Sequence, residues 1–175
     1  MIDINSDIAI DNAIRAYVKA CMSLRAIIKV HSDVLPLGVV SCGLFAEYYA
    51  KMYLEWKYPN GQLEYGRANE VGWDLLLRLD NFDFIRYQIK AVSVYNKKRS
   101  ISPIGNNCDR LIVTCLDEDY FPMRIYLFDD LSLISRARRN CQLTAPDLYI
   151  KSQRGSLEFH KFASEITEEF WDALM

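Results

Sequence analysis

The chain has 175 residues, enough for one domain with a buried core, and it carries a net charge of −2 with a pI near 5.7. Apolar residues make up 51% and charged residues 25%, which is ordinary for a globular protein and excludes a chain that is disordered by composition. The acidic balance argues against a protein whose whole surface binds nucleic acid, so any such contact needs a local basic patch.

The cysteines and the apolar runs bear on the cellular compartment. Five cysteines are scattered without a CxxC pair, which favours a reduced, cytoplasmic setting. The acidic N-terminus does not resemble a signal peptide, and the longest uncharged run, 34–46, is too short to cross a bilayer, so we expect no membrane contact. Neither His31 nor His160 stands at zinc-ligand spacing from a cysteine.

The first predicted element is an amphipathic helix over 7–30. Its apolar residues recur at steps of three and four: Ile10, Ile14, Tyr17, Val18, Cys21, Leu24 and Ile28. Arginines and lysines fill the other positions. Such a helix packs on its own domain or on a second copy of the chain, and contact with DNA is a further alternative.

A second helix is predicted from Ser41, as N-cap, to about Lys57, where Pro59-Asn60-Gly61 ends it. A short strand is expected at 62–66. Four longer strands follow, at 72–77, 84–95, 109–116 and 122–128, and helices are expected at about 129–140 and from about 156 to the end.

Strands in the middle and helices on either side predict a single α/β domain, 1–175, with a central mixed sheet flanked by helices. Within it we expect an N-terminal helix at 7–30, a core at 41–140 and a C-terminal helix at 156–175.

The most informative residues lie on the 72–77 and 84–95 strands. Asp74 precedes an apolar run, and Gln88 and Lys90, two residues apart, project from one face of the following strand. Charged groups among apolar residues are costly to bury unless they pair or bind a metal. A hairpin that combines Asp, Gln and Lys therefore suggests a magnesium site.

This pattern, Asp followed by Gln-x-Lys, resembles the PD-(D/E)xK nuclease superfamily, the restriction-endonuclease-like fold, in whose Mrr-like branches Gln commonly replaces Glu. The superfamily also places a glutamate on a helix before the Asp strand, and Glu47 in Gly43–Ala50 matches it. The strands expected at 109–116 and 122–128 resemble the next two core strands, so the resemblance covers about residues 40–130.

The resemblance implies a Mg²⁺-dependent endonuclease that hydrolyses phosphodiester bonds, with DNA as the expected substrate and Mn²⁺ as a substitute metal. It implies Glu47, Asp74, Gln88 and Lys90 as catalytic residues. It implies metal ligation by Asp74, Glu47, the Gln88 side chain and the Ile89 carbonyl. Lys97, Lys98 and Arg99 follow the lysine strand and are expected to contact the nucleic-acid backbone. A homodimer is expected from the same resemblance.

Each residue also has a structural alternative. Asp74 and Lys90 could form a buried ion pair, Glu47 could be a solvated residue paired with Lys51, and Gln88 could be an ordinary sheet residue. The whole protein has two alternatives as well. One is a non-catalytic module on the same fold that binds nucleic acid or protein, and the other is an immunity-type protein that binds only another protein.

Overall fold

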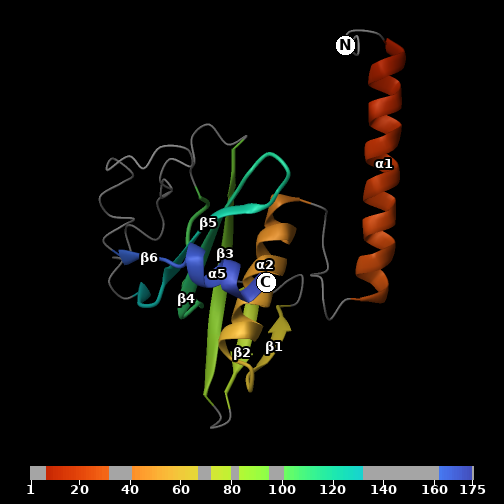
Figure 1. Cartoon of the computed structure of the whole chain (residues 1–175). Coiled ribbons are helices and arrows are strands. Elements are labelled where there is room, and N and C mark those ends of the chain that lie inside the picture. The colour runs from red at the N-terminus through yellow and green to blue at the C-terminus, as the bar shows by residue number, and fades with distance from the viewer. Residues whose placement is uncertain are drawn as a thin grey trace.

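The computed structural model describes residues 7–31, 41–66, 72–79, 83–94, 101–131 and 162–174. Among them are three helices and six strands (Figure 1). The helices are α1 (Asp7–Val30), α2 (Cys42–Lys57) and α5 (Thr167–Leu174). The strands are β1 (Gln62–Tyr65), β2 (Leu75–Arg78), β3 (Phe84–Ser93), β4 (Arg110–Leu116), β5 (Pro122–Phe128) and β6 (Ser164–Glu165).

The strands form one six-stranded sheet in the order β1-β2-β3-β4-β5-β6. Only β3 and β4 run parallel, with Gln88 opposite Leu111 and Lys90 opposite Val113, and every other neighbouring pair is antiparallel. The sheet is therefore mixed and flanked by helices, as the strand-rich middle of the sequence predicts.

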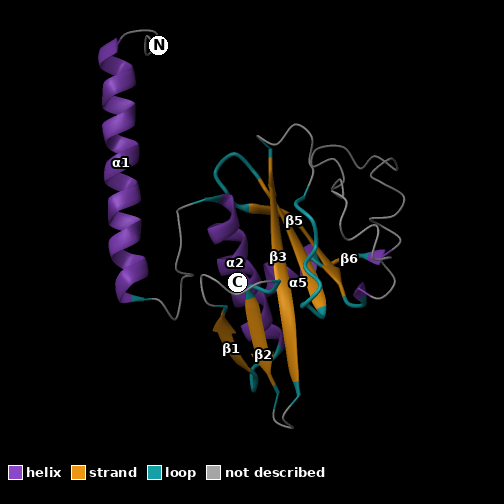
Figure 2. Cartoon of the chain, turned by 180° about the vertical axis from the view of Figure 1, so that it is seen from behind, coloured by secondary structure: helices purple, strands orange, loops and turns teal. Residues whose placement is uncertain are grey.

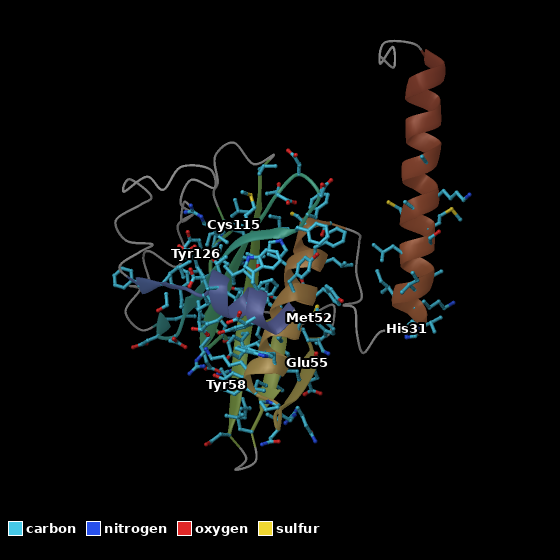
Figure 3. The ribbon with its side chains drawn as sticks, viewed as in Figure 1. His31, Met52, Glu55, Tyr58, Cys115 and Tyr126 are labelled. Carbon is cyan, nitrogen blue, oxygen red and sulfur yellow. The ribbon has the colours of Figure 1, made fainter. Side chains whose placement is uncertain are left out.

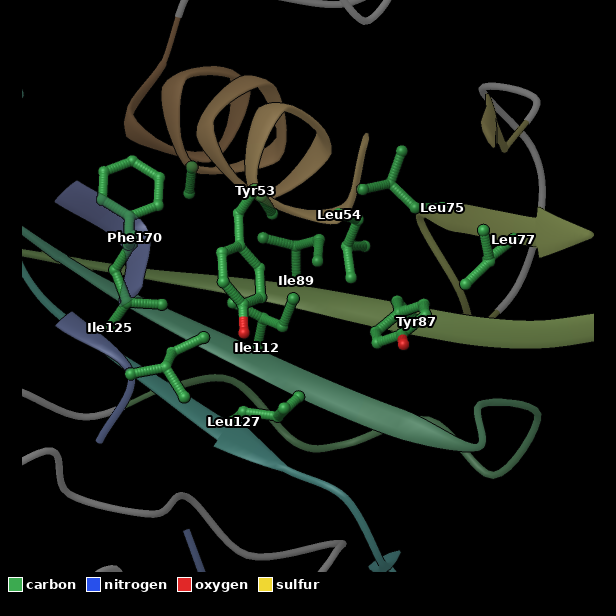
Figure 4. Packing of buried hydrophobic residues seen from close by; sticks show 13 residues of the cluster. Tyr53, Leu54, Leu75, Leu77, Tyr87, Ile89, Ile112, Ile125, Leu127 and Phe170 are labelled. Atoms are coloured by element: carbon green, nitrogen blue, oxygen red, sulfur yellow. The ribbon is translucent and has the colours of Figure 1, made fainter. Parts of the chain in front are cut away.

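One face of the sheet is covered by α2 and α5 (Figures 1 and 2). Tyr53 and Leu54 of α2 pack against inward-facing residues of four strands and against Phe170 of α5, as Figure 4 shows. The strand residues in this cluster are Leu75, Leu77, Tyr87, Ile89, Ile112, Ile125 and Leu127. They alternate along their strands because successive side chains point to opposite faces.

The other face is covered by the connection between β3 and β4. Ile101, Ile104 and Cys108 are buried there against the sheet residues Val92 and Leu111. A parallel pair needs a crossover, which is usually a helix. Here the 101–108 segment fills that position without a helix and supplies its own apolar side chains.

Two predicted elements differ from the structure. The strand expected at 72–77 begins only at Leu75, so Asp74 lies just before it, and Gly72 adopts a positive φ of 103°. The helix expected from about 156 to the end is not continuous: residues 163–166 are not helical, α5 runs over Thr167–Leu174, and 156–161 lie outside the described residues. Before α5, Ser164 and Glu165 pair with Leu127 and Tyr126 as β6, because the edge of β5 offers unpaired backbone groups to that segment.

The helices predicted at 7–30 and 41–57 are confirmed. Ser41 is the N-cap of α2 with extended backbone, although its side chain makes no capping hydrogen bond. The helix expected at 129–140 lies outside the described residues. None of the helices within the described ranges has both the length and the apolarity that crossing a membrane requires.

Candidate metal centre

Asp74 is held rigidly where three strands meet. Its backbone N–H donates to the Tyr87 carbonyl on β3, and its carbonyl accepts from the N–H of Gly66 just after β1, both at 2.8 Å. Its carboxylate oxygen Oδ2 accepts a hydrogen bond of 2.6 Å from the Ile89 N–H. The side chain therefore lies along the edge of β3 that β2 leaves unpaired.

The Ile89 carbonyl lies on the same edge. In a strand, the N–H and C=O of one residue point to the same side, and the Ile89 N–H points to Asp74. The backbone geometry is thus compatible with a cation that contacts both the Asp74 carboxylate and the Ile89 carbonyl.

Glu47 approaches Asp74 from α2. Its side chain is partly buried, and its pKa rises from 4.5 to about 7, first because burial disfavours the charged form and second because the negative charge of Asp74 repels it. Burial also raises the pKa of Asp74, against the opposing effects of the Ile89 N–H and the Lys90 ammonium. Two carboxyl groups thus share one poorly solvated site.

Neither carboxylate has a compensating ion pair among the described residues. The alternative that pairs Glu47 with Lys51 is wrong, because the Lys51 ammonium binds Glu55, one turn further along α2. Figure 3 labels Glu55 on that helix. Lys51 therefore does not neutralise the charge of Glu47.

Lys90 lies on the opposite face of the sheet from α2, with Gln88, because Tyr87 and Ile89 occupy the α2 face. Its ammonium donates to Ser102 Oγ at 2.8 Å. Burial lowers the Lys90 pKa, while the charge of Asp74 acts in the other direction. The negative charge of Asp74 thus acts on the Lys90 ammonium, but no ion pair within the described residues joins the two side chains.

Gln88 has a structural contact that the sequence did not reveal. Its side-chain oxygen accepts a hydrogen bond of 2.8 Å from the Gly105 N–H, and the side chain is 8% exposed. Gly105 in turn lies so close to Gly72 that a Cβ at position 105 would stand 2.7 Å from the Gly72 Cα. Gln88 therefore ties the 101–108 segment to the sheet beside Asp74, and its role as a metal ligand stays a prediction.

The sequence did not single out Ser102, Gly105 or Tyr65, which lie around the site. The Tyr65 pKa is raised by burial and then by the charge of Glu47. Contacts between residues so far apart in the sequence, such as Gly105 with Gln88, leave no local signal. Lys97, Lys98 and Arg99 lie outside the described residues.

The described residues contain no group of three or more His, Cys, Asp or Glu side chains arranged to bind a metal. His31 follows α1 directly and lies apart from the sheet (Figure 3). The donors at the candidate centre are two carboxylates and a backbone carbonyl. Magnesium accepts such a set, because it keeps several water ligands and needs only one or two carboxylates from the protein.

Comparison with known proteins gives a distant likeness in structure. No family model matches the chain, and no match was found among curated proteins. Among solved structures, the chain is similar to a bacterial homing endonuclease, I-Ssp6803I, with 15% identity and a TM-score of 0.43 over 75% of this chain and 87% of the other. A likeness at this level does not bear on activity, for which the geometry of the site is the evidence.

Proposed function

We propose that the protein is a metal-dependent nuclease whose centre is formed by Glu47, Asp74 and Lys90. The observation that carries the proposal is the pair of partly buried carboxyls, Glu47 and Asp74, which interact electrostatically and have no ion-pair partner among the described residues. Burying two acids side by side is costly unless a cation joins them. A divalent metal removes that cost.

Glu47, Asp74 and the Ile89 carbonyl would hold the cation. Magnesium, when bound, supplies positive charge that stabilises a phosphate in the transition state and acidifies a water ligand. The Lys90 ammonium is oriented by Ser102 Oγ, and burial lowers its pKa, so Nζ releases a proton more readily than an exposed lysine does. Lys90 can therefore assist proton transfer from water or offset charge on the phosphate.

The substrate that we propose is DNA, with Lys97, Lys98 and Arg99 contacting its backbone. These three residues begin four positions after the end of β3. Phosphate contacts dominate affinity for DNA and weaken as salt rises. Mn²⁺ is the expected substitute for Mg²⁺, since it accepts the same oxygen ligands.

A second candidate is a binding module without catalysis on the same fold. The bond from Gly105 to the Gln88 oxygen favours it, because an oxygen already used to hold the 101–108 segment is less available to a metal. This candidate predicts salt-dependent DNA binding with no cleavage under any metal.

The experiment is an incubation of the full chain with supercoiled plasmid, single-stranded DNA and single-stranded RNA, each with Mg²⁺, with Mn²⁺ and with a chelator. We expect nicking or linearisation of the plasmid with either metal and none with the chelator. Cleavage of RNA alone would overturn DNA as substrate. Binding of all three nucleic acids without cleavage would overturn the nuclease in favour of the binding module.

A further inference from the structure

Three large aromatic side chains are exposed on the layer that α2 and α5 form over the sheet. They are Trp56 of α2, Phe121 of the turn between β4 and β5, and Trp171 of α5, with exposed fractions of 47%, 54% and 40%. They are not scattered, because buried rings connect them. The Trp56 ring centroid lies 6.1 Å from that of Tyr53, which packs near Phe170 in the core (Figure 4). Connected exposed rings of this kind mark an interaction surface.

Phe170 of α5 lies at the centre of these ring contacts. Its centroid is 6.0 Å from that of Tyr49 and 5.7 Å from that of Trp171. The Tyr49 ring continues the contacts to Phe121, at 6.4 Å. The core therefore holds the exposed rings in place. The connected rings form an aromatic cluster: Tyr49, Tyr53, Trp56, Phe121, Phe170 and Trp171.

The turn that carries Phe121 is also fixed. Asp117 Oδ1 accepts hydrogen bonds from the N–H of Phe121 at 2.8 Å and from the N–H of Asp119 at 2.9 Å. Tyr120 has a positive φ of 63°, which bulky residues rarely adopt, and its ring stacks on Phe45 of α2 with centroids 5.1 Å apart. Because the turn is ordered before any partner binds, little conformational entropy is lost when Phe121 is covered.

Carboxylates lie beside the aromatic cluster. Glu168 and Asp172 are exposed on α5, on either side of Trp171 in the sequence, and neither has an ion pair within the described ranges. Burial raises the pKa of Tyr49, and the negative charge of Asp117 adds to that rise, so this carboxylate also acts on the cluster. The charge of this face repels phosphate and attracts cations.

We propose that the aromatic cluster and its carboxylates bind an arginine-rich amphipathic segment of a partner protein. An arginine pairs with a carboxylate in bidentate fashion, and its planar guanidinium stacks on a tryptophan ring. Apolar residues of the same segment cover Phe121 and Trp56. Aromatic and arginine side chains contribute most to affinity in protein interfaces. The cluster lies on the face of the sheet opposite Lys90, so the proposal does not depend on the nuclease proposal.

The first experiment measures fluorescence anisotropy of labelled probes mixed with the full chain. The probes are an amphipathic peptide of leucine and arginine, the same peptide with glutamate in place of arginine, and oligothymidine. Wild type is expected to bind the arginine peptide alone, with an affinity that falls as salt rises. Trp171→Ala and Phe121→Ala are each expected to weaken this binding by at least about tenfold.

Phe84→Ala is the matched control for the loss of an exposed ring. Phe84 is 51% exposed but lies on the other face of the sheet, because Ile85 and Tyr87 pack toward α2. It is expected to bind the arginine peptide as wild type does. Equal weakening by Phe84→Ala and Trp171→Ala overturns the proposal, since the peptide then adsorbs without a defined site.

The second experiment separates a defined site from general attraction to an acidic protein. Asp172→Lys is expected to weaken binding of the arginine peptide by roughly three- to tenfold, because it replaces attraction by repulsion beside Trp171. Asp83→Lys changes the net charge equally at an exposed position just before β3, outside the cluster, and is expected to keep the wild-type affinity. Equal weakening by the two variants overturns the proposal.

Thermal unfolding of each variant is measured in parallel, and Asp172→Lys still tests the site if Trp171→Ala fails to fold. A wild type that does not bind the arginine peptide overturns the proposal. Binding of oligothymidine that Trp171→Ala abolishes overturns it in favour of single-stranded nucleic acid. A dimer, measured by light scattering, that Trp171→Ala dissociates overturns it in favour of a second copy of the chain.

Discussion

Glu47 on α2 and Asp74 at the entrance of β2 share one site, in which the charge of Asp74 helps to raise the Glu47 pKa to about 7. The two residues are far apart in sequence and belong to different layers of the fold. The contact between α2 and the sheet brings them together, because Tyr53, Leu54 and Ala50 of the helix pack on Leu75 and Ile89 beside the site. The apolar core and the acidic pair thus depend on the same packing.

The first prediction concerns stability and pH in the absence of metal. Glu47 has a folded-state pKa near 7 against 4.5, so its contribution is fully present below pH 4.5 and is lost as pH rises to about 7. The free energy of unfolding should fall across this window by on the order of 3 kcal/mol at most. The raised pKa of Asp74 acts in the same direction.

Urea unfolding between pH 4.5 and 8 measures this loss. Glu47→Gln should flatten the pH profile, because the amide cannot ionise. Glu168→Gln, an exposed glutamate on α5, serves as the control and should keep the wild-type slope. A Glu47→Gln profile that matches wild type would show that the Glu47 carboxyl is not the group responsible.

The second prediction concerns magnesium binding and protons. A cation that binds the Glu47 carboxylate must displace its proton below pH 7, so affinity should rise with pH by at most about tenfold per pH unit and level off above it. Calorimetric titration of Mg²⁺ in two buffers of different ionisation enthalpy gives the number of protons released. We expect close to one proton at pH 6 and few at pH 8.

Asp74→Asn should abolish this binding, and Glu47→Gln should weaken it and remove the proton release. Asp83→Asn, an exposed carboxylate just before β3, should bind magnesium as wild type does. Equal binding by all three variants would place the metal at a site other than the Glu47–Asp74 pair.

The third prediction separates the two roles of Gln88. Gln88→Ala leaves the Gly105 N–H without its acceptor, so the free energy of unfolding should fall by about 1–3 kcal/mol. Gln88→Glu keeps an acceptor and adds a negative charge next to the site, so magnesium should bind more tightly. Unchanged magnesium affinity in Gln88→Glu would mean that Gln88 only supports the 101–108 segment.

The fourth prediction concerns the contact between α2 and α5. The Tyr53 ring is fully buried, and its hydroxyl donates to the Glu169 carboxylate at 2.9 Å while it accepts from the Lys57 ammonium at 2.8 Å. Tyr53→Phe should lower the free energy of unfolding by about 1–2 kcal/mol, measured by urea unfolding. Tyr48→Phe on the same helix is the control, and an equal loss there would argue against a specific role for the Tyr53 network.

The sequence predicted the elements whose residues repeat with a clear period. Two helices, at 7–30 and 41–57, and strands β3, β4 and β5 lie within two residues of the predicted limits. Glu47 was predicted as a site residue from the family resemblance, and in the structure the charge of Asp74 raises the pKa of its carboxyl. The local spacing of apolar residues was enough to predict an element where burial of one of its faces determines its structure.

The remaining features depend on contacts between distant residues. The Gln88 oxygen binds Gly105, and Lys90 binds Ser102, because the 101–108 segment folds back over the sheet. Ser164 and Glu165 become a strand only because the edge of β5 is available, which interrupts a run of apolar residues spaced as in a helix. The spacing of apolar residues within those segments does not predict such pairings.

The most direct test of the nuclease proposal is cleavage of supercoiled plasmid with Mg²⁺ by wild type, Asp74→Asn, Lys90→Met and the control Asp83→Asn, with the thermal stability of each variant measured in parallel. Metal-dependent nicking by wild type and by Asp83→Asn, lost in folded Asp74→Asn and Lys90→Met, is the predicted result. Undiminished nicking by either folded site variant, or no nicking by wild type with Mg²⁺ or Mn²⁺, would contradict the account.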